Sequence, residues 1–119
     1  GTAECELVDE IKAYEEYMKV IKKNSTNAFL EEETQIEVND LINKGVKKWY
    51  VTGCVTDICV KQFTLTLKTY FNKENLDMDV IVIKNCVDTF DAPGHSAEEM
   101  NKYSFMDMSQ AGVKVIEEF

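Results

Sequence analysis

The chain has 119 residues, 45% of them hydrophobic, which fits one small domain over residues 1–119 with its own buried core. Its formal charge of −9 argues against sequence-independent nucleic-acid binding, because such binding relies on a surplus of Lys and Arg. No apolar run approaches the roughly 20 residues that a membrane helix needs, and the first ten residues lack the pattern of a secretory signal. We therefore expect a soluble, cytoplasmic protein that binds neither nucleic acid nor membranes.

The first half of the chain predicts a helix, a strand and a second helix. A polar opening over residues 3–16 favours helix, and YMKVIKK (17–23) is typical of a short strand. NSTNAF (24–29) follows as a loop rich in hydrogen-bonding side chains. Residues 32–43 favour a helix with acidic residues at its N-terminus, and Gly45 is placed to end it.

The middle of the chain predicts a strand, a helix and a second strand. KKWYVTG (47–53) is a β-branched and aromatic run of strand length. The next segment (56–71) has apolar residues at helical spacing, and either Thr56 or Asp57 is a candidate N-cap. MDVIVIKNCV (78–87) is a continuous apolar run, as expected of a strand that is covered on both faces.

The last part of the chain predicts one more helix and one more strand. Ser96 is a candidate cap for a helix that runs to about Gln110, and VKVIE (113–117) is a closing strand. Strands and helices in alternation imply right-handed crossovers and a parallel sheet. The predicted fold is therefore α/β, a three-layer αβα Rossmann-like architecture with a mainly parallel sheet.

The stretch YVTGCVTDICVKQF (50–63) places Cys59 at the junction between a strand and a helix. Ligands of open parallel sheets bind beyond the carboxyl ends of the strands, and Cys59 follows such an end. In the first turn of a helix, free N–H groups favour a thiolate and can stabilise an oxyanion. Cys59 is thus a candidate nucleophile; the alternative is a small buried residue at a tight junction.

The other cysteines carry less information. We expect Cys54 and Cys86 to be core residues and all four thiols to be reduced, whereas Cys5 indicates nothing. The C-x4-C spacing has no second cysteine pair, and His95 is the only histidine, so zinc and iron–sulfur binding are not expected. A redox pair of Cys54 and Cys59 is an alternative, although it would need a sharply folded strand end.

Two kinds of side chain are candidate partners of a nucleophilic Cys59. His95 lies in the loop before the last helix, where it is either a base or an ordinary loop histidine. Lys22 and Lys23 end the first predicted strand, where they either face the same edge of the sheet or belong to a solvated strand end.

Several segments together resemble one family. VTGCVTDICV (51–60), followed by a long helix, resembles the cysteine-hydrolase signature of the isochorismatase-like superfamily, which includes nicotinamidases, N-carbamoyl amide hydrolases and isochorismatases. GTAECELV (1–8), VIKKNSTNAF (20–29) and NCVDTFDAPGHSAEEMN (85–101) resemble further segments of that family. The resemblance covers essentially the whole chain.

The resemblance implies a role for each of several residues. Cys59 would be the nucleophile, and the Cys54–Val55 peptide would be the family's non-proline cis bond. The backbone N–H groups of Val55 and Cys59 would form the oxyanion hole. The catalytic lysine aligns with Lys23 rather than with Lys22.

Two elements of the family have no counterpart in the chain. The third catalytic residue is an aspartate on the family's first strand, and the next segment carries the metal ligands of nicotinamidases. We therefore expect the C-terminal two-thirds of the fold, without its N-terminal strand. No cofactor or metal ligand is expected within this chain. A nicotinamidase-like divalent metal would take its ligands from the N-terminal part of the family's fold, which this chain does not match.

The resemblance predicts a hydrolase that cleaves an amide-like C–N bond of a small molecule through a thioester, with Lys23 stabilising the thiolate of Cys59 and the aspartate moving protons. The alternatives are hydrolysis of a vinyl ether, as in isochorismatases, and a non-catalytic binding or assembly domain or an inactive fragment. The family often forms homo-oligomers, and we expect the same here.

Overall fold

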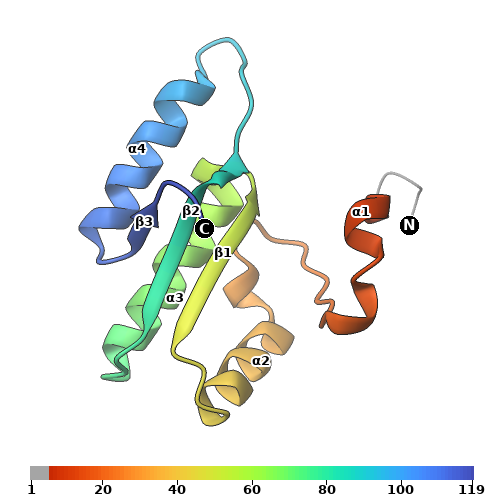
Figure 1. The fold of residues 1–119 in the computed structure, drawn as a ribbon. Helices are drawn as coiled ribbons and strands as arrows, with labels where there is room; N and C mark the ends of the chain where they lie inside the picture. Colours follow the sequence, from red (N-terminus) through yellow and green to blue (C-terminus); the bar gives the residue numbers. More distant parts are fainter. Residues whose placement is uncertain (1–5) are drawn as a thin grey trace.

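The computed structural model of the chain describes residues 6–119. Three parallel strands form the sheet in the order β1–β2–β3 (Figure 1): Lys48–Cys54, Asp79–Asp88 and Lys114–Ile116. Three long helices alternate with them: α2 (Glu32–Asn43), α3 (Lys61–Lys73) and α4 (Ala97–Gln110). The expected α/β class and parallel sheet are confirmed.

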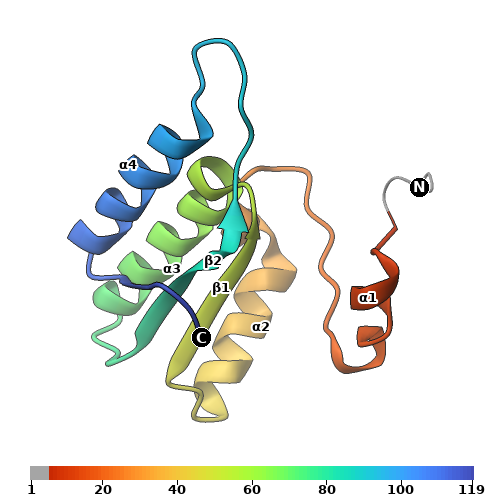
Figure 2. The same ribbon diagram turned by 45° about the horizontal axis from the view of Figure 1, so that its top comes forward.

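One hydrophobic core joins the sheet to these three helices. Alternate residues of the strands point to the same side, since side chains of a strand alternate between its faces. The core contains residues of β1, β2, α2, α3 and α4: Trp49, Val51, Val80, Val82, Val38, Leu67, Phe71 and Met108. The three helices therefore cover one face of the sheet, and Figure 2 shows them side by side.

The opposite face of the sheet is covered differently. Ile81 and Ile83 of β2 are buried there. The ring of Phe119, the last residue, contacts the ring of Tyr50 on β1 at 5.3 Å between centroids. Figure 1 shows the C-terminus lying in front of the sheet, so the end of the chain shields part of this face.

The ends of two helices follow the sequence closely. After α2, Gly45 has a φ of +87°, its N–H bonds to the carbonyl of Ile42, and the N–H of Val46 bonds to that of Leu41. This is a Schellman ending, which favours glycine because of the left-handed conformation. At the start of α4, the hydroxyl of Ser96 accepts the N–H of Glu99, as the cap prediction expects.

The N-terminal segment differs from the prediction. The helix expected over residues 3–16 is reduced to the short α1 (Asp9–Lys12) and the 3-10 turn η2 (Glu15–Tyr17), and residues 3–5 lie outside the described part. The strand expected over 17–23 is wrong, because these residues pair with no strand of the described sheet.

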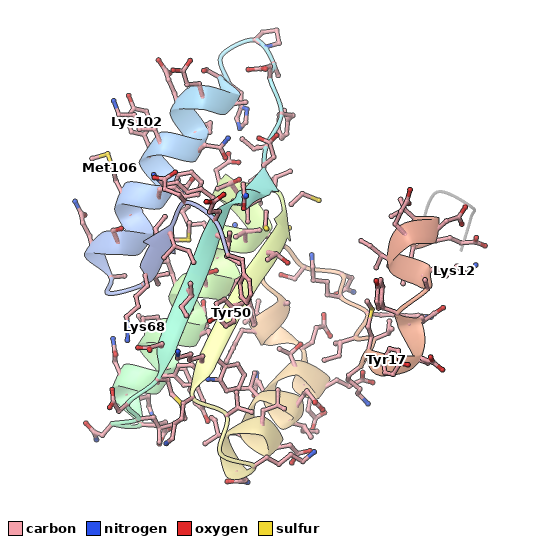
Figure 3. All side chains as sticks on the ribbon, viewed as in Figure 1. Lys12, Tyr17, Tyr50, Lys68, Lys102 and Met106 are labelled. Carbon is pink, nitrogen blue, oxygen red and sulfur yellow. The ribbon has the colours of Figure 1, made fainter. Side chains whose placement is uncertain are left out.

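The reason for both differences is the lack of a packing partner. Side chains of residues 6–20 are all exposed, and Tyr17 is 80% accessible. A short helix is marginal without a packed face, and a strand needs a neighbour to satisfy its backbone groups. Figures 1 and 3 show the segment standing apart from the sheet, with Lys12 and Tyr17 labelled on it.

Among the described residues, we find no helix with the length and hydropathy required to cross a membrane.

Candidate active site

The site is built around the turn that connects β1 to α3. β1 ends at Cys54, the Cys54–Val55 peptide bond is cis, and a π-helical turn, η4 (Thr56–Val60), leads directly into α3. Cys59 lies in this turn and is half-buried. The fold therefore places a partly accessible thiol at the carboxyl end of a parallel strand, where ligands of such sheets bind.

The backbone of the turn leaves a gap in the usual hydrogen-bond ladder. The carbonyl of Val55 accepts the N–H groups of Ile58 and Val60, which lie three and five residues further on. It does not accept the N–H of Cys59, which lies four residues further on and would be its partner in a regular α-helix. A five-residue step is the mark of a π turn, a distortion that is frequent at functional sites. The N-cap prediction is wrong, since the cap position is Val55 and no side chain caps the turn.

Lys23 reaches Cys59 from a distant part of the chain. Its Nζ lies 3.5 Å from the Cys59 Sγ across 36 positions and also donates to the carbonyl of Ser25 at 3.0 Å. The contact brings a basic side chain and a thiol together from segments that are far apart in the chain. Lys22 does not hydrogen-bond Cys59; it lines a hollow of about 270 Å³ with Lys23, Asn24 and Glu31.

A short polar loop holds Lys23 in place. Thr26 Oγ1 donates to Gln62 Oε1 at 2.7 Å, and Asn27 Nδ2 donates to Thr66 Oγ1 at 3.1 Å. Positions 59, 62 and 66 are spaced as one face of a helix, so the loop that begins at Lys23 runs along the face that carries Cys59. The sequence indicated a polar loop here, but not its partners on α3.

A second pair of titratable groups joins the same turn to the loop before α4. Asp57 Oδ2 is 2.8 Å from His95 Nε2, and the other ring nitrogen, Nδ1, is 2.7 Å from the carbonyl of Phe90. Both side chains are largely buried, at 11% and 21% exposure. His95 therefore contacts Asp57 and makes no hydrogen bond to Cys59 within the described residues.

The pKa values of this pair move apart. Burial opposes the ionisation of Asp57, but the neighbouring side chains of Thr89 and His95 outweigh it and lower the pKa of the carboxyl. The hydrogen bond to Asp57 is also the main reason that the pKa of His95 is raised. The sequence indicates Asp57 only as a cap, because no short spacing links it to a histidine 38 positions away.

The remaining cysteines are more accessible than expected. Cys54 and Cys86 are exposed, so the prediction that both belong to the core is wrong. Both lie near the carboxyl ends of their strands, beyond a shift in the β1–β2 register at residues 51–53. Cys54, Cys59 and Cys86 are free thiols, and Cys5 lies outside the described residues.

A metal ion does not fit the residues at this site. Over residues 6–119, no three His, Cys, Asp or Glu side chains gather closely enough to hold one. Both ring nitrogens of His95 already have protein partners. The divalent metal of a nicotinamidase-like centre thus has no ligand set in this part of the chain.

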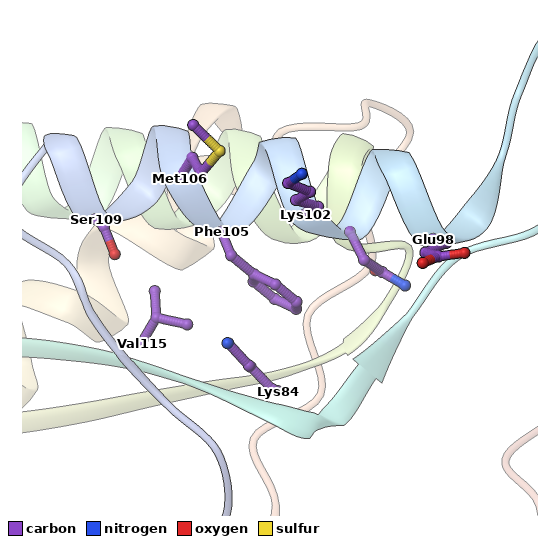
Figure 4. Close-up of a pocket in the computed structure, with 8 residues that line it drawn as sticks. Lys84, Glu98, Lys102, Phe105, Met106, Ser109 and Val115 are labelled. Atoms are coloured by element: carbon purple, nitrogen blue, oxygen red, sulfur yellow. The ribbon is translucent and has the colours of Figure 1, made fainter.

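A larger hollow lies elsewhere. A space of about 600 Å³ lies beside α4 and is lined by Phe105, Met106, Val115, Lys84 and Lys102 among others. Figure 4 shows these side chains. Neither Cys59 nor Lys23 lines it. A hollow of about 630 Å³ is lined by Lys12, Lys22 and Lys23 among others, so size does not single out the space beside α4. The contact between Lys23 and Cys59 favours the η4 turn.

Known protein families and structures were compared with the chain. A family model described as isochorismatase domain matches residues 1–118. No curated protein matches the chain.

Solved structures with the same fold include nicotinamidase PncA from Bacillus subtilis, at 18% identity and a TM-score of 0.74, covering 98% of this chain and 60% of that one. The YcaC gene product of Escherichia coli, described as an octameric hydrolase of unknown specificity, is 25% identical with a TM-score of 0.69, covering 94% and 48%. YcaC from Pseudomonas aeruginosa, described with hexane-2,5-diol and covalent acrylamide, is 24% identical with a TM-score of 0.71, covering 94% and 48%. The chain thus spans about half to three-fifths of the length of these proteins.

Proposed function

Since the chain belongs to the isochorismatase domain family, we propose that it carries the thiol part of a hydrolase site that cleaves an amide-like C–N bond of a small molecule. The observation that carries this proposal is the 3.5 Å contact between Lys23 Nζ and Cys59 Sγ. Two residues 36 positions apart meet at the carboxyl end of a strand, one as a nucleophile and the other as the cation that stabilises it.

The proposed reaction has two stages. The Cys59 thiolate adds to the carbonyl carbon of the substrate while Lys23 compensates its charge. The N–H groups of Val55 and Cys59 stabilise the oxyanion. This role is supported by the hydrogen bonds of the turn, in which the Val55 carbonyl accepts the N–H groups of Ile58 and Val60 but not that of Cys59. The C–N bond breaks, the amine leaves with the proton that the Cys59 thiol gave up on ionising, and the acyl group stays on sulfur. Water then adds to the thioester, the C–S bond breaks, and a carboxylic acid and the thiol are released.

The proton carrier of this reaction is not assigned to a residue of this chain. Of the described residues, only Lys23 hydrogen-bonds the sulfur of Cys59. Asp57, although two residues away, is directed to His95 and is not available for that step. The aspartate that the family uses remains the expected carrier, and the complete activity is a proposal for a protein that contains it.

Nicotinamide is the first substrate to test, because nicotinamidases from Bacillus subtilis and yeast share the fold. A direct test of the thiol itself uses an activated ester, p-nitrophenyl acetate. We expect a burst of about one equivalent of p-nitrophenolate and an acetyl group on Cys59, located by mass spectrometry.

Two variants make this test specific. Cys59→Ser should abolish the burst, whereas Cys86→Ser removes another accessible thiol and should preserve it. Equal acetylation of Cys54, Cys59 and Cys86 would contradict a dedicated nucleophile and favour a binding or assembly domain.

We also propose that the protein forms a homo-oligomer. The Escherichia coli YcaC relative is described as octameric. The described N-terminal segment exposes a series of large apolar side chains: Leu7, Val8, Ile11, Tyr14, Tyr17, Met18 and Val20. Light scattering during size-exclusion chromatography tests this, and a monomer at every accessible concentration would contradict it.

A further inference from the structure

The side chain of His95 joins the loop between β2 and α4 to the Cys59 turn. His95 Nε2 lies 2.8 Å from Asp57 Oδ2 in η4, and its Nδ1 lies 2.7 Å from the carbonyl of Phe90 in its own loop. The ring of Phe90 stacks on the imidazole at 4.1 Å between centroids, with 10° between the planes. Reciprocal backbone bonds of 2.8 Å between Ala92 and His95 close the loop.

These contacts fix the protonation state of His95. A backbone carbonyl can only accept a hydrogen bond, so Nδ1 must carry a proton. An ionised carboxylate can also only accept, and the lowered pKa of Asp57 keeps it ionised, so Nε2 must carry a proton as well. Both bonds therefore exist together only when His95 is an imidazolium cation.

We propose that cationic His95, paired with Asp57, is a positioning residue for Cys59: it holds the η4 turn against the 89–96 loop, so that the reactivity of the thiol depends on the charge of His95. Asp57 precedes Cys59 by two residues in the same turn, so a change in its position moves the thiol. The inference rests on the proposed function only in taking Cys59 as the reacting group.

The charges around His95 support this coupling. The elements packed against its loop carry acidic side chains with few cations: Asp57 in η4, Asp88 and Asp91 in the loop, Glu98 and Glu99 in the first turn of α4, and Asp107 paired with Lys61. Cys59 is the other titratable group of the η4 turn. Of these groups, Asp57 is the one whose charge helps to raise the pKa of His95, and this favours the imidazolium.

The direction of the pH effect follows from the raised pKa of His95. The bond to Asp57 is complete below the ordinary histidine pKa of about 6.5. As pH rises through the higher pKa of the folded protein, the imidazole keeps only one of its two N–H donors and loses the positive charge that attracts Asp57, so the pair weakens. Cys59 should therefore react more slowly above that pH than its thiolate fraction alone would give.

Two measurements on the full chain test this. His95 is the only histidine, so its NMR titration is unambiguous; we expect a pKa above the ordinary value, and a lower one in Asp57→Asn. The rate of Cys59 alkylation by iodoacetamide, followed by mass spectrometry against pH, should break at the same pH. In His95→Gln the break should disappear, and the rate below it should fall about tenfold.

Asp57→Asn gives a second route to the same loss if His95→Gln folds poorly, and the fluorescence of Trp49 reports folding in each case. Glu98→Gln, which removes a nearby charge but no contact to His95, should keep the break. A His95 titration that Asp57→Asn leaves unchanged, or a break that persists in folded His95→Gln, would overturn the proposal.

These outcomes are independent of the proposed hydrolase reaction. If the activated ester leaves no acetyl group on Cys59, the hydrolase proposal fails. A break in alkylation that follows the His95 titration would still support the positioning role.

Discussion

Residues 28–119 pack around one hydrophobic core, whereas residues 6–23 contribute nothing to it. In the first region, strands and helices share one core in which Leu67, Phe71 and Met108 are essentially inaccessible. In the second region, apolar side chains are present but exposed, and two short helical turns are all that forms. Apolar residues thus produce stable elements only where a partner surface completes their burial.

The candidate site lies at the border of these two regions. Cys59 belongs to the packed region, whereas Lys23 is the last residue of the unpacked one. Between them, polar contacts from Thr26 and Asn27 to α3 replace hydrophobic packing. The position of the lysine therefore depends on a few hydrogen bonds, each of which is worth far less than a buried aromatic ring.

The largest difference between the regions is expected from ring deletions. Phe71→Ala should lower the free energy of unfolding by about 3–5 kcal/mol, because the ring is fully buried against Trp49 at 5.1 Å. Tyr17→Ala, at 80% exposure, should change it by no more than about 0.5 kcal/mol. Urea unfolding followed by Trp49 fluorescence measures both changes. Equal changes would contradict the difference in packing between the two regions.

The next largest effect is expected at the border. Asn27→Ala removes the bond to Thr66 and the one that caps the 3-10 turn η3 (Ala28–Leu30), at a cost of about 1–2 kcal/mol. It should also slow alkylation of Cys59, because Lys23 loses its support. Asn43→Ala, at the exposed end of α2, is the matched control. Loss of stability without any change at Cys59 would show that the loop does not position Lys23.

A smaller effect is expected at the start of α4. Ser96→Ala removes the bond to the N–H of Glu99 and should cost about 1 kcal/mol. Ser109→Ala lies near the end of the same helix, is exposed and serves as the control. Thermal unfolding of the two variants should differ by a few degrees, and identical midpoints would mean that the cap contributes nothing.

The smallest effect is expected on the surface. Lys114→Gln breaks a 3.0 Å ion pair with Asp79 in which both side chains are accessible, so the loss should stay below about 1 kcal/mol. It should shrink further in 1 M salt, where charges are screened. A larger loss of stability that is insensitive to salt would contradict a solvent-exposed ion pair between Lys114 and Asp79.

The sequence predicted the packed region well because its signals are local. The helix over residues 32–43, the Gly45 ending and the Ser96 cap are set by neighbouring residues, and all three are confirmed. The strand over 17–23 failed because pairing depends on a distant partner. The exposure of Cys86 was missed for a similar reason, since it depends on how far β2 extends past its neighbours.

The site shows the same division. The position of Cys59 in a turn after a strand could be predicted from the residues around it. The hydrogen bond between Asp57 and His95 could not be predicted, because Asp57 alone fits an ordinary helix cap and His95 alone fits an ordinary loop. The 36-residue connection from Lys23 to Cys59 was implied only by resemblance to a family, and no spacing within the chain indicates it.

The most direct test of the Lys23–Cys59 pair is the rate of alkylation of each cysteine below pH ~8.5, the ordinary range of thiol ionisation, in Lys23→Gln and Lys22→Gln. Both variants remove one positive charge from adjacent positions, but only Lys23 contacts the sulfur. We expect Cys59 to react faster than Cys54 and Cys86, to slow to their level in Lys23→Gln, and to keep its rate in Lys22→Gln. Equal slowing in both variants, or in neither, would contradict the pair.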